Sequence, residues 1–106
     1  MSVLNITSEN YEKEVVAAQL PVLLELWAPW CKYCRRIAPV VERVAQEYEG
    51  KVIVAQCNVD DAPKLAEKFK VDIIPSMFVL KNGEPGEKIV NPPSQDALEA
   101  WMNPQL

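Results

Sequence analysis

The chain has 106 residues, of which 49% are hydrophobic and 25% charged, a composition that fits one globular domain with a buried core and argues against a disordered chain. Its formal net charge of −4 disfavours binding to nucleic acid, because phosphate backbones repel an acidic surface. With three cysteines and no histidine, the chain is not built on a disulfide framework and lacks Ser-His pairs, Cys-His pairs and imidazole metal ligands.

The first part of the chain predicts a strand, a helix and a second strand. Residues 3–6 form a short candidate strand, and Thr7 or Ser8 can cap the helix that follows. Pro21 ends this helix. Residues 22–27 are apolar almost without alternation, which is typical of a buried strand in a sheet covered on both faces.

The middle of the chain repeats the helix and strand pattern. Apolar residues recur every three or four positions over 31–48, which predicts a helix that ends before Gly50. An apolar strand follows within 51–58. A short helix is expected over 63–69, with a proline in its first turn.

The last part predicts a hairpin and a closing helix. Asn82 and Gly83 separate candidate strands at 76–81 and 87–90, and this dipeptide favours a tight hairpin turn. Residues 94–102 begin with a capping serine and form a helix. The element order predicts one α/β domain over 1–106, in which a mixed five-stranded sheet lies between layers of helices, four in all.

The N-terminal region indicates where the protein works. Residues 1–15 lack the basic start, apolar run and cleavage site of a secretory signal. The longest apolar stretch, 22–27, is interrupted by Glu25 and is too short to cross a membrane. We therefore expect a cytoplasmic protein without a membrane segment.

The main chemical feature is the pair Cys31 and Cys34, which follows a predicted strand and opens a predicted helix. Positions i and i+3 share a helix face, so the two sulfurs can bond. The positive end of the helix favours a thiolate at Cys31. A zinc site would need two more ligands, and only Cys57 remains, so redox chemistry is favoured and Cys57 is expected to be a buried core residue.

The sequence WAPWCKYC at 27–34 resembles the active-site signature of the thioredoxin family. Glu25 stands six residues before the first cysteine of the pair, the dipeptide Ile74-Pro75 follows the third predicted helix, and Lys81 opens the Lys-Asn-Gly hairpin. These matches occur in the same order as in the family, and the resemblance covers almost the whole chain. It implies the thioredoxin fold and thiol–disulfide oxidoreductase activity without a cofactor or a metal.

The resemblance also implies catalytic roles. Cys31 would attack a substrate disulfide, and Cys34 would resolve the mixed disulfide that forms. Glu25 would be the buried acid that exchanges a proton with the resolving thiol; the alternative is a strand carboxylate that is merely paired.

A substrate-binding surface is implied around the pair. Its members would be Trp30, Lys32, Tyr33, Ile74, Pro75 and Asn91. Pro75 would be a cis-proline facing the disulfide, with the backbone of Ile74 offered to a bound peptide; an ordinary trans bond is the alternative.

Four positions depart from the family pattern. Lys32 and Tyr33 replace the usual Gly-Pro, which predicts a more stable Cys31 thiolate and a disulfide that is easier to reduce. Gln56 replaces a lysine near Glu25, which predicts a raised pKa for that carboxyl. Asn91 replaces a glycine in the last substrate loop, so the partner surface is expected to differ.

The leading hypothesis is a monomeric reductase of protein disulfides in cell redox homeostasis. Because the sequence has no dinucleotide fingerprint, a separate reductase would supply its electrons. One alternative is a more oxidising, glutathione-linked oxidoreductase or a disulfide isomerase. Another is a non-catalytic module that docks partners through Trp30, Ile74 and Asn91.

Overall fold

A mixed β-sheet with the strand order β1-β3-β2-β4-β5 forms the middle layer of the fold, and β6 also pairs with β4. The computed structural model describes residues 3–106, so the first two residues of the predicted domain lie outside the described part. The strands are β1 (Leu4–Ile6), β2 (Val22–Trp27), β3 (Ile53–Asn58), β4 (Ser76–Lys81), β5 (Glu84–Pro85) and β6 (Ile89–Val90). Strand β3 pairs in parallel with β1 and β2, whereas β4 is antiparallel to its neighbours β2, β5 and β6.

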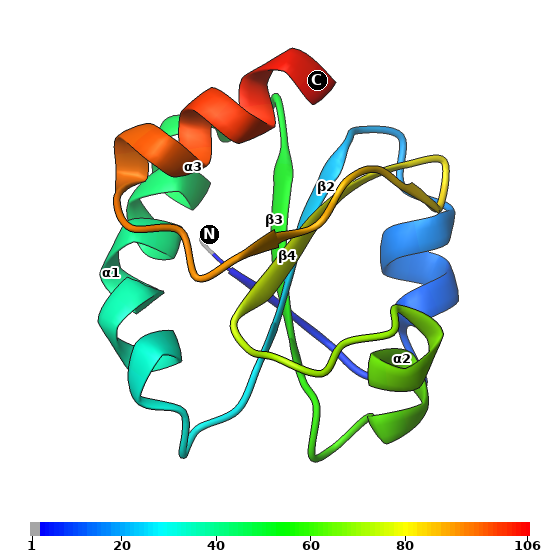
Figure 1. The fold of residues 1–106 in the computed structure, drawn as a ribbon. Coiled ribbons are helices and arrows are strands. Elements are labelled where there is room, and N and C mark those ends of the chain that lie inside the picture. Colours follow the sequence, from blue (N-terminus) through cyan, green and yellow to red (C-terminus); the bar gives the residue numbers. More distant parts are fainter. Residues whose placement is uncertain (1–2) are drawn as a thin grey trace.

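Helices cover both faces of this sheet (Figure 1). They are the π-helical turn η1 (Glu12–Val16), α1 (Lys32–Glu47), α2 (Pro63–Lys68), α3 (Gln95–Met102) and the 3-10 turn η2 (Asn103–Gln105). Helices α1 and α3 lie together on one face, and η1 and α2 lie on the other. The predicted three-layer α/β/α thioredoxin fold is confirmed.

Two apolar cores flank the sheet, and β2 contributes to both. Leu23 packs into the core under α1 and α3, whereas Leu24 and Leu26 pack into the core under η1 and α2. Every residue from Val22 to Leu26 is buried. The absence of alternation in this strand therefore reflects a sheet with both faces covered.

The predicted first helix is wrong in extent and type. The regular helical segment is a single π-helical turn at Glu12–Val16. Thr7 caps the turn that leads into it: the Thr7 N–H donates to Asn10 Oδ1 at 2.7 Å, and the Asn10 N–H donates to the Thr7 hydroxyl at 3.4 Å. This reciprocal pair is a capping-box arrangement, and the Tyr11 N–H donates to the Thr7 carbonyl oxygen at 3.1 Å.

The hairpin at Asn82 and Gly83 is confirmed, with φ angles of 54° and 79°. The strand predicted at 87–90 is shortened to β6 at Ile89–Val90, and the two-residue strand β5 before it was not predicted, so the sheet has six strands and not five. Strand β5 pairs Pro85 with Leu80, and the Gly86 N–H still donates to the Val79 carbonyl oxygen at 2.9 Å. Pairing with β4 then stops and resumes at Ile89 in β6. Among residues 3–106, none of the helices has the length and apolar character needed to cross a membrane.

Candidate active site

Cys31 and Cys34 form a disulfide where β2 leads into α1. Their Cα atoms are 5.2 Å apart. Cys31 is the N-cap of α1, and its Sγ accepts a hydrogen bond of 3.2 Å from the Cys34 N–H. A donor aimed at Sγ favours a negative charge there once the disulfide is reduced. The predicted pairing of these cysteines is therefore confirmed, and the local backbone favours a thiolate at Cys31.

The backbone that faces the disulfide comes from the loop before β4. The Ile74-Pro75 peptide bond is cis, as the resemblance implied. The Ile74 carbonyl oxygen lies 3.7 Å from Cys31 Sγ. This loop thus brings a backbone acceptor next to the sulfur that a substrate would approach.

Large apolar side chains are exposed around this edge of the molecule. Trp30 is 65% exposed and Tyr33 is 53% exposed. Trp30 is oriented by its Nε1, which donates to Asp60 Oδ2 at 2.8 Å. Ile73, which is not among the predicted site residues, is 57% exposed. Lys32 is also exposed beside these residues in the chain.

Asn91 lies against the loop before β4 that contains Ile74 and Pro75. It has a φ of 47°, a left-handed conformation that asparagine adopts more readily than most residues. Its N–H donates to the Pro75 carbonyl at 2.9 Å. Arg36, which sequence reasoning missed, donates from Nη2 to Asn91 Oδ1 at 2.6 Å.

Glu25 lies in the middle of β2 and is only 4% exposed. Burial raises its pKa from 4.5 to about 8, because a charged carboxylate loses its hydration there. Its neighbour in the ladder is Gln56 of β3, an uncharged residue. The predicted raised pKa of Glu25 is therefore confirmed.

A cavity of about 250 Å³ connects this carboxyl group with the redox pair. It is lined by Glu25, Trp27, Cys34, Arg35, Ala38, Glu42 and Gln56. Cys34 lines this cavity, whereas Cys31 does not. The arrangement provides space for a water or a direct contact through which Glu25 and Cys34 can exchange a proton.

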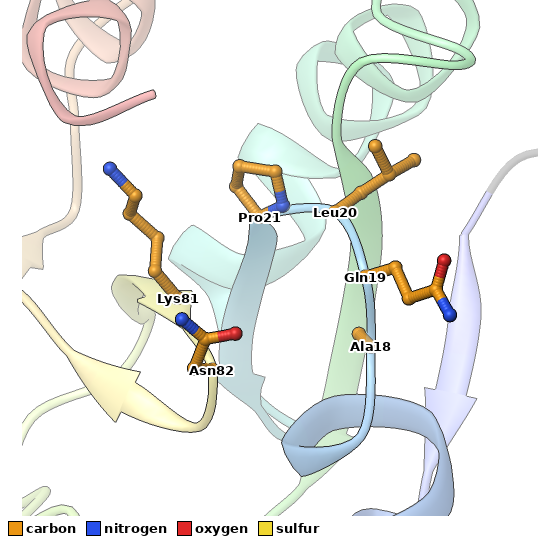
Figure 2. A pocket seen from close by; sticks show the side chains of 6 residues that line it. All are labelled: Ala18, Gln19, Leu20, Pro21, Lys81 and Asn82. Carbon is orange, nitrogen blue, oxygen red and sulfur yellow. The ribbon is translucent and has the colours of Figure 1, made fainter.

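A second, smaller pocket of about 110 Å³ lies where β2 begins and β4 ends. Figure 2 shows its lining: Ala18, Gln19, Leu20, Pro21, Lys81 and Asn82. These residues include one amine and two amides but no thiol or carboxyl group. The lining therefore offers no group for redox or acid–base chemistry like that at the cysteine pair.

The third cysteine, Cys57, is separate from this chemistry. It is free, fully buried in β3, and packed in the core under η1 and α2. Burial, with a smaller contribution from Asp61, raises the pKa of its thiol from 9.0 to about 11. Within residues 3–106 the structure also brings together no cluster of ligand side chains that could hold a metal ion.

We expect Cys57 to resist alkylation in the folded, reduced protein. Iodoacetamide at neutral pH should modify Cys31, and it should reach Cys57 only after unfolding, because a buried neutral thiol is a poor nucleophile. Peptide mapping by mass spectrometry would locate the modified residues. Modification of native Cys57 as fast as Cys31 would contradict this expectation.

Comparisons with known proteins give a consistent result. The family model described as Thioredoxin matches residues 2–104. The chain is 37% identical over 103 residues to a thioredoxin of Porphyra purpurea, with 97% of this chain and 96% of that protein covered. It is 35% identical over 99 residues to a thioredoxin of Rickettsia bellii, with coverage of 93% and 94%. It is also 35% identical over 101 residues to Thioredoxin 1 of a Nostoc species, with coverage of 95% and 94%.

Proposed function

The chain belongs to the thioredoxin family of thiol–disulfide oxidoreductases, and from this membership we infer that it reduces disulfide bonds in partner proteins through Cys31 and Cys34. The observation that carries this inference is the position of the disulfide. It lies at the N-terminus of α1, with the Ile74 carbonyl beside one sulfur and the Glu25 cavity beside the other.

In the first step the reduced enzyme forms a mixed disulfide. The Cys31 thiolate attacks one sulfur of the substrate disulfide, the substrate S–S bond breaks, and the other substrate sulfur leaves as a thiolate that takes up a proton. Cys31 is suited to this step because it is the N-cap residue, and the Cys34 N–H donates to its sulfur.

In the second step the enzyme is oxidised and the substrate is released. Ionised Glu25, about a tenth of the molecules at pH 7 because its pKa is about 8, accepts the proton of Cys34, and the Cys34 thiolate then attacks Cys31 Sγ. The mixed disulfide breaks, the Cys31–Cys34 disulfide forms, and the second substrate sulfur leaves as a thiol after protonation. Two electrons have then passed to the substrate. The intramolecular attack is fast because the Cys31 and Cys34 Cα atoms are 5.2 Å apart.

Partner proteins and an electron donor complete the cycle. We propose that a separate reductase returns two electrons to the Cys31–Cys34 disulfide, and that partner proteins dock over Trp30, Lys32, Tyr33, Ile74, Pro75 and Asn91. The exposure of Trp30 and Tyr33 supports docking, because large apolar side chains at the surface favour protein contacts. We further propose that the protein acts in the cytoplasm as a monomer.

The reduction potential of the cysteine pair tests this proposal. A general reductase of protein disulfides should equilibrate with thiol buffers near about −270 mV, whereas a glutathione-linked oxidoreductase would lie near about −200 mV. Tryptophan fluorescence would follow the equilibrium, and thiol trapping would check it. We expect a value closer to −270 mV, displaced toward oxidising by Lys32 and Tyr33. Failure of Cys31 and Cys34 to form a reversible disulfide would overturn the proposal.

A further inference from the structure

A hydrogen-bonded arginine links α1 to the segment that follows β6. Arg36 Nη2 donates to Asn91 Oδ1 at 2.6 Å and to the Pro92 carbonyl oxygen at 3.2 Å. Arg36 stands two positions after Cys34 in α1 and is exposed. Its contact with Asn91 joins residues that are 55 positions apart in the chain. Hydrogen bonds donated by a charged guanidinium are stronger than those between neutral groups.

The same segment is fixed on its other side by the loop that faces the disulfide. The Asn91 N–H donates to the Pro75 carbonyl at 2.9 Å, and the neighbouring Ile74 carbonyl is the one beside Cys31 Sγ. Residues 91–92 are therefore held between α1 and the loop before β4. Asn91 must keep a φ of 47° there, which its backbone alone favours only weakly.

We propose that Arg36 is a specificity-determining residue that positions Asn91 for contact with partner proteins. This inference rests on the proposed function, in which Asn91 belongs to the docking surface. A segment held in its bound conformation before a partner arrives loses less conformational entropy on binding. Without Arg36, the partner must order the segment itself, so binding weakens while the chemistry at Cys31 stays in place. A small disulfide that does not reach Asn91 depends much less on this effect.

Arg43 provides a matched control for Arg36. It lies in the same helix, and its Nε donates to Gln95 Oε1 at 3.0 Å, so it also links α1 to the C-terminal part of the chain. Both arginines are exposed. The variants Arg36→Gln and Arg43→Gln thus each remove one exposed positive charge and the hydrogen bonding of one guanidinium. They differ in which segment they release, residues 91–92 or the first residue of α3.

The test measures single-turnover reduction of insulin by the dithiothreitol-reduced protein. For Arg36→Gln we expect the insulin concentration at half-maximal rate to rise about tenfold, with the maximal rate changed less than about twofold. The rate constant with dithiobis(nitrobenzoate) should fall much less than that with insulin. For Arg43→Gln the half-maximal concentration should stay within about twofold of wild type. Equal shifts in the two variants would overturn the proposal.

Two further measurements separate positioning from simple charge attraction. The higher half-maximal insulin concentration of Arg36→Gln should persist at about 0.5 M salt, where attraction between exposed charges is largely screened. The variant Asn91→Gly keeps the left-handed backbone but removes the Oδ1 acceptor. The double variant should raise the insulin concentration at half-maximal rate by less than the product of the two single increases, because both changes remove the same contact. The positioning role would be overturned if the effect of Arg36→Gln disappeared in salt. It would also be overturned if the increases in half-maximal insulin concentration of the two single variants multiplied in the double variant.

The wild-type protein decides whether the proposed function itself fails. If wild type reduces dithiobis(nitrobenzoate) but not insulin, protein disulfides are not its substrates, and the proposed function is wrong. If wild type reduces insulin but Arg36→Gln and Arg43→Gln have equal half-maximal insulin concentrations, only the proposed role of Arg36 is wrong.

Discussion

Replacing Cys34 by serine should trap partner proteins on Cys31, and replacing Cys31 by serine should lower disulfide reduction by more than about a thousandfold. The first change removes the sulfur that breaks the mixed disulfide, so this intermediate accumulates. The second removes the nucleophile itself. Cys31 is the better attacking group because it caps α1 and accepts the Cys34 N–H. Non-reducing gel electrophoresis of the protein incubated with oxidised insulin would show the trapped species, and insulin turnover would give the rate.

Cys57 gives this experiment its control. Because it is fully buried and free, a Cys57→Ala background leaves only one cysteine in each active-site variant without altering the redox pair. Trapped species in this background can involve Cys31 alone when Cys34 is absent. Equal trapping by the Cys31→Ser variant would show that either sulfur can attack the substrate, which contradicts distinct roles for Cys31 and Cys34. Partner binding that survives loss of both cysteines would instead indicate a non-catalytic docking module.

Much of the fold could be predicted because local patterns and turn chemistry agree with it. The run Val22–Trp27, which is apolar except at Glu25, appears in the structure as β2 with the predicted bounds. Ser94 accepts a hydrogen bond from the Ala97 N–H, as a capping serine should. Asn82 and Gly83 take the positive φ angles that the hairpin requires. In each of these cases the signal lies within a few neighbouring residues.

The features that could not be predicted depend on contacts between distant segments or on local hydrogen bonds. Helix periodicity does not reveal that the capped turn at Thr7 is followed by only one π-helical turn, η1. Arg36 has no sequence signal, because its partner Asn91 is 55 residues away. The hydrogen bond from Trp30 to Asp60 joins residues 30 positions apart in the same way. The catalytic pair was visible in the sequence, but the residues that orient its surroundings were not.

Glu25 should dominate the pH dependence of the free energy of unfolding. Burial raises the pKa of Glu25 from 4.5 to about 8. Between these values the folded protein keeps a proton that the unfolded chain releases, so the free energy of unfolding falls as pH rises. Above pH 8 the accumulated loss is as much as about 5 kcal/mol, at about 1.4 kcal/mol per pKa unit. The variant Glu25→Gln cannot ionise and should lack this loss.

Denaturant unfolding of the oxidised protein at pH 5 and pH 9 would measure the effect. From pH 5 to pH 9 the free energy of unfolding of Glu25→Gln should fall by several kcal/mol less than that of wild type. The variant Glu87→Gln, which removes an exposed carboxyl group between β5 and β6, should follow the wild-type curve. If wild type and Glu25→Gln have the same pH dependence, Glu25 does not hold a proton in the folded state at neutral pH.

The same substitution should separate the two chemical steps of the reaction. At pH 7 the ionised fraction of Glu25, about a tenth given a pKa of about 8, is the proton acceptor in the cavity beside Cys34. Glu25→Gln removes this acceptor, so the second step should slow by about a hundredfold. The first step needs only the Cys31 thiolate and should change far less. Rapid acid quench followed by mass spectrometry would then detect a mixed disulfide although Cys34 is present. Raising the pH should restore the second step, because Cys34 can then lose its proton to hydroxide. A mixed disulfide that persists equally at all pH values would instead indicate displaced sulfurs, and Glu25 would then be a structural residue.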